Sequence, residues 1–333
     1  MNQKNPKQPV LEVKDLSVRF HTKKGVVTAV DGVDFTIQSG EILGIVGESG
    51  CGKSVTSLSI LGLLSENAEI GAQSRILFEG ENLLELTEKQ MCAMRGKAIS
   101  MIFQDPMTSL NPMQTIGHQL AEAAILHRCV SKKQAREDAL RMLQKVGIPS
   151  PEQRLNEYPH QLSGGMKQRV MIAMAMMCEP KLLIADEPTT ALDVTIQAQI
   201  LKLMKSLQRE TGTAVMLITH DMGVVAYMSD AILVMYAGRV VEYGSADRIF
   251  NRPIHPYAIG LLNSRPRLDK DVQKLYTIEG TVPNQYDMPE GCKFAPRCPY
   301  ATEQCHREEP RLLPDKEGAV RCFRAQKEET ASE

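Results

Sequence analysis

The sequence predicts an α/β core with an antiparallel β subdomain, a helical insertion and a small Cys-rich C-terminal module. Three observations support this fold class. Short, wholly apolar runs alternate with helix-length segments, which is typical of strands buried on both faces of a sheet. Amphipathic helical patterns fill the long stretch between two of those runs. Four of the eight cysteines follow residue 291.

The elements follow one another in a regular order. Residues 11–20 and 27–37 alternate apolar and polar side chains, as half-buried antiparallel strands do, and residues 42–46 form the first continuous apolar run. A glycine-rich turn and a helix are expected next. The remaining expected elements are amphipathic helices between about residues 105 and 165, a helix at 164–177 whose methionines pack in the core (Met166, Met171, Met174, Met176, Met177), a strand at 181–186, a helix at about 195–210, a strand at 214–220 and β segments at 232–244.

Composition excludes several classes of protein. The 333 residues are 43% hydrophobic and carry 39 basic against 40 acidic side chains, which is typical of a globular chain rather than a disordered one. Near-neutrality argues against nucleic-acid binding, which usually needs a basic face. No apolar run approaches the roughly 18 residues of a membrane-spanning helix, and the first residues do not resemble a secretory signal. We therefore expect a soluble, cytoplasmic protein.

The turn after residue 46 matches the phosphate-binding pattern G-x-x-x-x-G-K-[ST]. Its glycines let backbone N–H groups point at phosphate oxygens, and the following helix adds the positive end of its dipole. Lys53 is expected to reach the β- and γ-phosphates, and the Ser54 hydroxyl to bind Mg²⁺. The predicted nucleotide-contacting residues are Gly47, Glu48, Ser49, Gly50, Cys51, Gly52, Lys53, Ser54 and Val55.

A second apolar strand, residues 181–186, ends in adjacent carboxylates. Asp186 is expected to hold Mg²⁺ through water, and Glu187 to orient or deprotonate the attacking water. An acidic pair after an apolar strand is common and can simply be a solvated strand end. Together with a phosphate-binding loop upstream, however, it predicts an NTPase that requires Mg²⁺.

Several further motifs resemble those of ATP-binding-cassette (ABC) ATPases and occur in that family's order. They are the signature Leu162-Ser163-Gly164-Gly165-Met166, the Q-loop glutamine Gln104, the D-loop Ala191-Leu192-Asp193, the switch histidine His220 and the adenine-stacking aromatic Phe20. The resemblance covers about residues 10–250. A P-loop kinase or GTPase would lack the signature, and a soluble ABC protein of DNA repair or of the ribosome would carry twin cassettes or long coiled-coil insertions.

The resemblance implies how the site residues act. Glu187, His220 and Gln104 would be catalytic, and Gln104 would join Ser54 and Asp186 around Mg²⁺. Ser163, Gly164, Gly165 and Asp193 would serve an ATP molecule held by the P-loop of a second cassette. Two ATP molecules would then lie between paired cassettes, and hydrolysis would loosen the pair.

Longer strings resemble the ATPase subunits of dipeptide and oligopeptide importers. They are Phe103-Gln104-Asp105-Pro106-Met107-Thr108-Ser109-Leu110-Asn111-Pro112, Tyr158-Pro159-His160-Gln161, Thr189-Thr190-Ala191-Leu192-Asp193-Val194-Thr195 and His255-Pro256-Tyr257. This resemblance implies a related second ATPase as a heterodimer partner, two membrane permeases, an extracytoplasmic solute-binding protein and a place at the cytoplasmic face of the membrane. Nickel and other small-solute importers share these strings. The helical insertion would receive a permease coupling helix, with Met107, Leu110 and Met113 lining that groove or forming the insertion's own core.

The clustered cysteines Cys292, Cys298, Cys305 and Cys322 have the spacing C-x5-C-x6-C-x16-C. Structural zinc sites usually contain short C-x2–4-C pairs, which are missing here, whereas cluster ligands tolerate varied spacing. The importer resemblance implies a [4Fe–4S] cluster; zinc or no metal are the alternatives. We expect an ABC ATPase domain at 1–254, with its helical subdomain at about 105–165, and a C-terminal extension at 255–333. Because every ATP-site motif precedes His255, Cys298→Ser should leave the ATP site intact.

Overall fold

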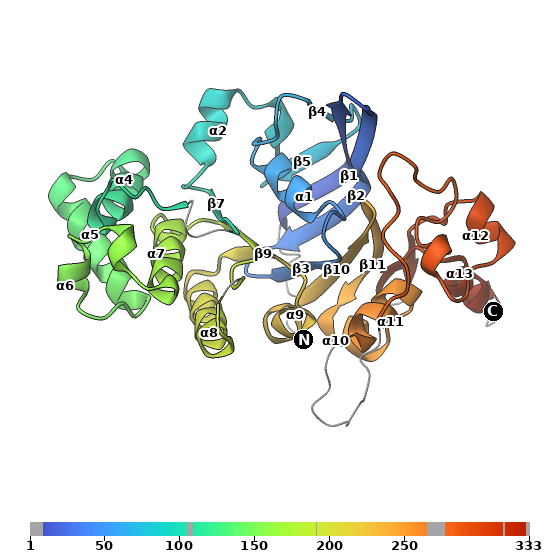
Figure 1. Ribbon diagram of the computed structural model, residues 1–333. Coiled ribbons are helices and arrows are strands. Elements are labelled where there is room, and N and C mark those ends of the chain that lie inside the picture. Colours follow the sequence, from blue (N-terminus) through green and yellow to red (C-terminus); the bar gives the residue numbers. More distant parts are fainter. Residues whose placement is uncertain (1–8, 105–108, 191, 265–276, 316, 331–333) are drawn as a thin grey trace, which may run out of the picture. The chain divides into compact units, whose positions relative to one another are not determined.

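The computed structural model describes residues 9–104, 109–190, 192–264, 277–315 and 317–330 (Figure 1). Asp105 to Thr108 of the Q-loop string and Ala191 of the D-loop lie outside these residues. Contacts divide the chain into two compact units, which are described separately. The signature unit comprises Met1–Leu11, Ile37–Glu41 and Phe78–Leu217, and the P-loop unit comprises Glu12–Thr36, Ile42–Leu77 and Ile218–Glu333.

The signature unit contains three neighbouring strands of a sheet, β7 (Ile99–Ile102), β8 (Leu182–Asp186) and β9 (Ala214–Thr219), the last of which extends into the P-loop unit. β7 and β8 are parallel, with Ile99 opposite Leu182 and Ile102 opposite Ala185. Every residue of β8 and β9 is buried, as the continuous apolar runs predict for strands covered on both faces. Parallel pairing places the carboxyl ends of β7 and β8 at the same edge of the sheet.

Helices form most of the rest of this unit. Figure 1 shows α4 (Ile116–Arg128), α5 (Lys132–Lys145), α6 (Pro151–Arg154) and α7 (Gly164–Met176) gathered in one group, in which α4, α5 and α7 pack on one another. The expected amphipathic helices are therefore present, and Met171, Met176 and Met177 are buried as core residues. The unit also contains β6 (Glu81–Asn82), η1 (Leu83–Glu85), α2 (Glu88–Met94), η2 (Pro159–Gln161) and α8 (Val194–Thr211).

The P-loop unit contains parts of two sheets. In one, β3 (Ile42–Val46) pairs in parallel with β10 (Ala231–Tyr236), and β10 pairs antiparallel with β11 (Arg239–Ser245). In the other, β1 (Pro9–Thr22) lies between β2 (Gly25–Gln38) and β5 (Arg75–Phe78) and also pairs antiparallel with β4 (Ala68–Ile70). The predicted antiparallel strands are thus present. The helices between these strands are α1 (Lys53–Ile60), α9 (Met222–Met228) and α10 (Ala246–Asn251).

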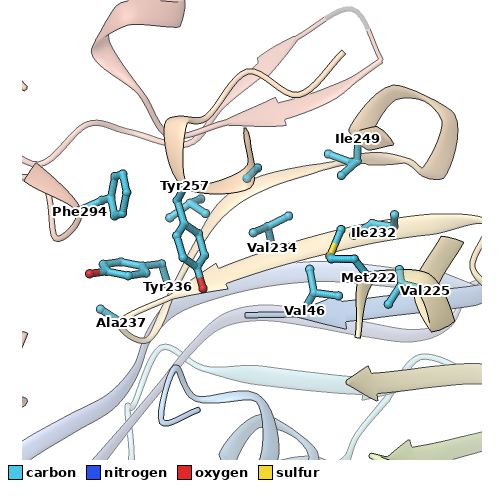
Figure 2. Close-up of a cluster of buried hydrophobic side chains, with 12 residues drawn as sticks. Val46, Met222, Val225, Ile232, Val234, Tyr236, Ala237, Ile249, Tyr257 and Phe294 are labelled. Atoms are coloured by element: carbon cyan, nitrogen blue, oxygen red, sulfur yellow. The ribbon is translucent and has the colours of Figure 1, made fainter. Parts of the chain in front are cut away.

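The chain beyond residue 254 shares the core of the P-loop unit. We call its described part, residues 255–264, 277–315 and 317–330, the C-terminal segment. Tyr257 and Phe294 from this segment pack in one cluster with Val46, Val234 and Tyr236 from the sheet (Figure 2). The strand β13 (Gly318–Val320) also pairs with β11. The elements of the segment are α11 (Pro256–Asn263), η3 (Ala295–Arg297), α12 (Glu303–Arg307), β12 (Leu313–Asp315), β13 (Gly318–Val320) and α13 (Phe323–Thr330).

Candidate functional site

The phosphate-binding loop connects the buried strand β3 to helix α1. Gly52 is the N-cap of α1 with φ 102°, and a Cβ atom there would lie 2.6 Å from the Ala29 carbonyl oxygen, so the position requires glycine. Lys53 folds back over the loop, where its Nζ donates to the carbonyl oxygens of Gly47 at 2.7 Å and Glu48 at 3.1 Å. Ser54 is exposed in the first helical turn, and Val55 is half-buried. This loop can present a lysine and a hydroxyl to a bound phosphate.

The rest of the loop divides into an exposed tip and a buried thiol. Ser49 and Gly50 are exposed at the tip. Cys51 is buried, with its Sγ 3.7 Å from the Nζ of Lys53. Burial raises the pKa of the Cys51 thiol despite the nearby ammonium, so the protonated, weakly nucleophilic form is favoured. The thiol therefore packs the loop from inside.

Two further predicted residues lie at strand ends in the P-loop unit. Phe20, near the end of β1, is half-buried and opposite Ala68 of β4. His220 follows β9 and is exposed. Asp221, the next residue, caps α9 by accepting the backbone N–H of Gly223 at 2.7 Å. The histidine is therefore held between a buried strand and a capped helix.

In the signature unit, Gln104 and Glu187 lie together at the carboxyl ends of β7 and β8. The Gln104 Nε2 donates to Glu187 Oε2 at 2.9 Å, and the Thr190 hydroxyl donates to the same oxygen at 3.0 Å. Asp186, the last residue of β8, is buried. Glu187 has φ 48°, a left-handed conformation that is uncommon outside glycine and clusters at functional sites. The carboxylate is thus held in a defined position by an amide and a hydroxyl.

The signature motif begins a helix, as the sequence predicts. Ser163 is the N-cap of α7, and its hydroxyl accepts the backbone N–H of Met166 at 3.4 Å. Gly164 and Gly165 open the helix, and Ser163 and Gly164 are exposed, so backbone N–H groups and a hydroxyl face outward. Asp193 caps α8 in the same way, accepting from the N–H of Ile196 at 2.9 Å. A helix start with exposed donors can bind an anion.

The four clustered cysteines line one cavity. Its volume is about 360 Å³, and its walls include His255, Phe294 and Pro310 beside Cys292, Cys298, Cys305 and Cys322. All four thiols are free and half-buried. Burial raises the pKa of Cys292 to about 11 and also raises that of Cys298. The backbone N–H of Cys292 donates to the Cys305 carbonyl at 2.8 Å, which ties two of the loops together.

The four cysteines line this cavity but do not form a preformed metal site. Among the described residues, no group of three or more His, Cys, Asp or Glu side chains converges as the ligands of a single metal ion do. A preformed zinc site is therefore not found in this part of the chain.

Sequence reasoning missed the residues that contact the P-loop from the C-terminal segment. The Tyr257 hydroxyl and the Arg297 guanidinium both bind Glu48, and Gln285 Nε2 donates to the Gly50 carbonyl at 3.3 Å. The C-terminal segment therefore contacts the P-loop, although every predicted ATP-site motif precedes His255. The tripeptide at 255–257 was a usable signal for the extension, but no sequence feature reveals its contact with the loop.

No helix in the described part of the chain is long and apolar enough to cross a membrane.

The ABC transporter family matches residues 30–190, and the C-terminal region of oligopeptide/dipeptide transporters matches residues 241–305. The oligopeptide transport ATP-binding protein OppD of Salmonella typhimurium is 54% identical over 92% of this chain and 90% of its own length. The dipeptide transport ATP-binding protein DppD of Bacillus subtilis is 55% identical over 91% of this chain and 90% of its own.

Solved structures show the same cassette fold. A dimeric ATP-binding cassette in a post-hydrolysis state, bound to ADP and Pi, aligns with a TM-score of 0.63 at 27% identity, covering 71% of this chain and 98% of its own. The CbiO1 protein of Clostridium perfringens, part of an ABC transporter complex, gives a TM-score of 0.63 at 29% identity. The alignment covers 74% of this chain and 92% of CbiO1.

Proposed function

Because this chain belongs to the ABC transporter family, we propose that it is the ATP-hydrolysing subunit of an importer of di- or oligopeptides. The chain is an ABC-type ATPase by family and fold. The main observation that supports the peptide cargo is identity above 50% to oligopeptide and dipeptide transport ATP-binding proteins over about nine-tenths of the chain. The matching oligopeptide/dipeptide C-terminal region supports the same cargo.

The proposed chemistry assigns a role to each of the predicted site residues. Lys53 and the N–H groups of the P-loop hold the β- and γ-phosphates, and Phe20 stacks on the adenine. The oxygen donors of Ser54, Asp186 and Gln104 suit Mg²⁺, which neutralises phosphate charge when bound. Glu187 orients and deprotonates the attacking water, for which its carboxylate is positioned by Gln104 and Thr190. His220 completes the site near the γ-phosphate.

A second cassette supplies the other face of each ATP. Ser163, Gly164 and Gly165 present donors at an exposed helix start, and Asp193 caps the neighbouring helix. We place these groups on the nucleotide held by a partner's P-loop, with a related ATPase as that partner in a heterodimer. The chain then works at the cytoplasmic face of the membrane, with two permeases and an extracytoplasmic binding protein.

The helical insertion is the proposed contact with a permease. Met113 is 82% exposed and Leu110 is buried, so of these two residues the methionine is available to a coupling helix and the leucine belongs to the insertion's core. Met107, the third residue of the predicted groove, lies outside the described residues. The division into an ATPase domain at 1–254 and an extension at 255–333 is part of the same proposal.

The cysteine cavity is the proposed site of a [4Fe–4S] cluster. Cys292, Cys298, Cys305 and Cys322 would hold it, and the raised pKa values of Cys292 and Cys298 mean that a bound cation is needed to keep those sulfurs ionised. A bound cluster would form a bond with each of the four cysteine sulfurs and would thereby link the loops around the cavity. We assign it a structural role in this segment.

Transport in a reconstituted system tests the cargo. The chain is assembled with its partner ATPase, permeases and binding protein in proteoliposomes, and ATP-dependent uptake of a labelled dipeptide, a labelled tetrapeptide and Ni²⁺ is compared. We expect peptide uptake that Lys53→Ala abolishes. Uptake of Ni²⁺ without uptake of peptide would replace the peptide assignment with a small-solute importer. ATP hydrolysis without any transport would point to a non-transport ABC ATPase.

A further inference from the structure

The C-terminal segment holds the side chain of a P-loop residue. Arg297 forms a bidentate ion pair with Glu48, in which Nη1 lies 2.6 Å from Oε2 and Nη2 lies 3.1 Å from Oε1. The Arg297 side chain is only 4% exposed. A guanidinium that meets a carboxylate through both nitrogens fixes its orientation as well as its charge. The second residue of the loop is therefore anchored by a residue 249 positions later.

Arg297 is itself held in place on its other sides. Its Nε donates to the Glu279 carbonyl at 3.0 Å, and its Cζ lies 5.8 Å from the centre of the Tyr236 ring. Weaker contacts at 3.4 Å join it to the Tyr236 hydroxyl and the Ile278 carbonyl. The surrounding segment therefore directs the Arg297 guanidinium at Glu48. Arg297 is not a flexible surface residue that happens to lie nearby.

The backbone of Glu48 is held as well. Its N–H donates to the Tyr257 hydroxyl at 2.8 Å. Tyr257 is fully buried, with its ring 4.7 Å from that of Tyr236 and 5.4 Å from that of Phe294 (Figure 2). The hydroxyl therefore has little freedom to move, and the peptide plane before Glu48 takes its orientation from this aromatic cluster.

These contacts bear on the nucleotide because Glu48 also faces Lys53. The Glu48 carbonyl accepts from Lys53 Nζ at 3.1 Å, so the residue that Arg297 and Tyr257 hold is one that contacts the phosphate-binding lysine. In addition, Glu48 places a carboxylate in a loop built to receive a polyanion. An unpaired carboxylate there would repel phosphate, and Arg297 neutralises it.

We propose that Arg297 is a positioning residue for the nucleotide site: together with Tyr257 it fixes Glu48 and cancels its charge, so the C-terminal segment sets the affinity of the P-loop for nucleotide. The inference rests on the proposed function only in taking residues 47–54 as the ATP site. It is independent of the cargo and of any cluster in the cysteine cavity.

Nucleotide binding to the purified full-length chain tests this role. Arg297→Gln should weaken binding of a fluorescent ATP analogue about tenfold, because an unpaired carboxylate then faces the phosphates. The loss should shrink as salt is raised, since screening hides the exposed charge. In the assembled complex KM for ATP should rise by a similar factor while kcat changes less than about twofold, because Arg297 does not touch the reacting atoms. Arg252→Gln, which removes a surface ion pair with Glu317 in the same unit, is the matched control.

A double variant separates the effect of the unpaired charge from an effect on folding. Glu48→Gln combined with Arg297→Gln removes both charges, so the double variant should bind nucleotide more tightly than Arg297→Gln alone. Tyr257→Phe removes only the hydroxyl and should weaken binding about threefold. If Arg297→Gln does not fold, Tyr257→Phe provides the test, and wild-type affinity in that variant would overturn the proposal.

Two further results would overturn the proposal. One is wild-type affinity in a folded Arg297→Gln chain, and the other is a fall in kcat with KM unchanged. Absence of nucleotide binding in the wild-type chain would instead refute the proposed function, so the two failures are distinguishable.

Discussion

Glu242 of β11 is a fully buried acid, and replacing it should destabilise the junction that leads to Tyr257. Its carboxylate accepts from the Arg248 Nη1 at 2.9 Å and from the backbone N–H groups of Ile254 and His255, each at 2.9 Å. Arg248 also binds Asp315, with Nη2 at 2.8 Å. Burial raises the pKa of Glu242 despite these donors. The network is therefore costly to form and costly to break.

The size of the effect follows from what each substitution leaves behind. Glu242→Ala leaves the N–H groups of Ile254 and His255, one half-buried and one buried, without this acceptor, and it removes one of the two carboxylates that Arg248 binds. Each unsatisfied donor costs about 1–3 kcal/mol, and breaking a buried ion pair costs about 3–5 kcal/mol. Because these costs overlap, we expect the free energy of unfolding to fall by about 4 kcal/mol. Glu242→Gln keeps one acceptor oxygen but turns an amide N–H group toward a donor. We therefore expect this variant to lower the free energy of unfolding by about 2 kcal/mol.

Tyrosine fluorescence and near-ultraviolet circular dichroism can follow the denaturant-induced unfolding. The chain has no Trp, so both signals come largely from its eight Tyr residues, including the buried pair Tyr236 and Tyr257. Glu317→Ala, which removes only an exposed ion pair with Arg252, should cost less than about 0.5 kcal/mol. A loss below about 1 kcal/mol for Glu242→Ala, or a greater loss for Gln than for Ala, would refute the reasoning.

Four further predictions concern turnover, pairing, metal and pH. Glu187→Gln should bind ATP but lower turnover of the assembled complex by at least about 100-fold, with the closed dimer accumulating; near-normal hydrolysis would remove Glu187 from its role. Ser163→Arg should impair hydrolysis in the complex and leave ATP binding by the isolated chain intact, and an equal loss of binding would argue against a partner's ATP at this motif. Chain purified without oxygen should contain iron and acid-labile sulfide that Cys298→Ser removes, whereas stoichiometric zinc without iron would contradict the cluster. Burial, with Arg321 nearby, lowers the pKa of His255 to about 3, so the unfolded chain binds the extra proton and the free energy of unfolding should fall by about 2 kcal/mol from about pH 8 to about pH 5. His255→Asn, which can still cap α11, should flatten that slope relative to exposed His160→Asn.

The strands and the phosphate-binding loop could be predicted because their causes are local. A strand buried on both faces reads as an uninterrupted apolar run, as at 42–46 and 182–186. Gly52 is specified by its own φ and by one close carbonyl. The hydrogen bond between Gln104 and Glu187 was not predicted, because the strand at 99–102, which precedes Gln104 and pairs with β8, was not identified in the sequence.

The contacts on Glu48 could not be predicted in the same way. Tyr257 and Arg297 follow it by 209 and 249 residues, and neither belongs to a periodic pattern that points at the loop. Contacts of this kind depend on which surfaces the fold brings together. A single sequence records them only as an isolated tyrosine after His-Pro and as one arginine among many.

The pairing of β13 with β11 has a consequence for truncation of the chain. Cutting after residue 254 would uncover the β11 edge, whose Glu242 to Gly244 now pair with Gly318 to Val320, and would leave unpaired N–H and C=O groups open to other chains. The native sheet ends instead on β12, a three-residue strand in which Pro314 cannot donate a hydrogen bond. Versions of this chain that end before β13 should therefore aggregate through the open edge of β11.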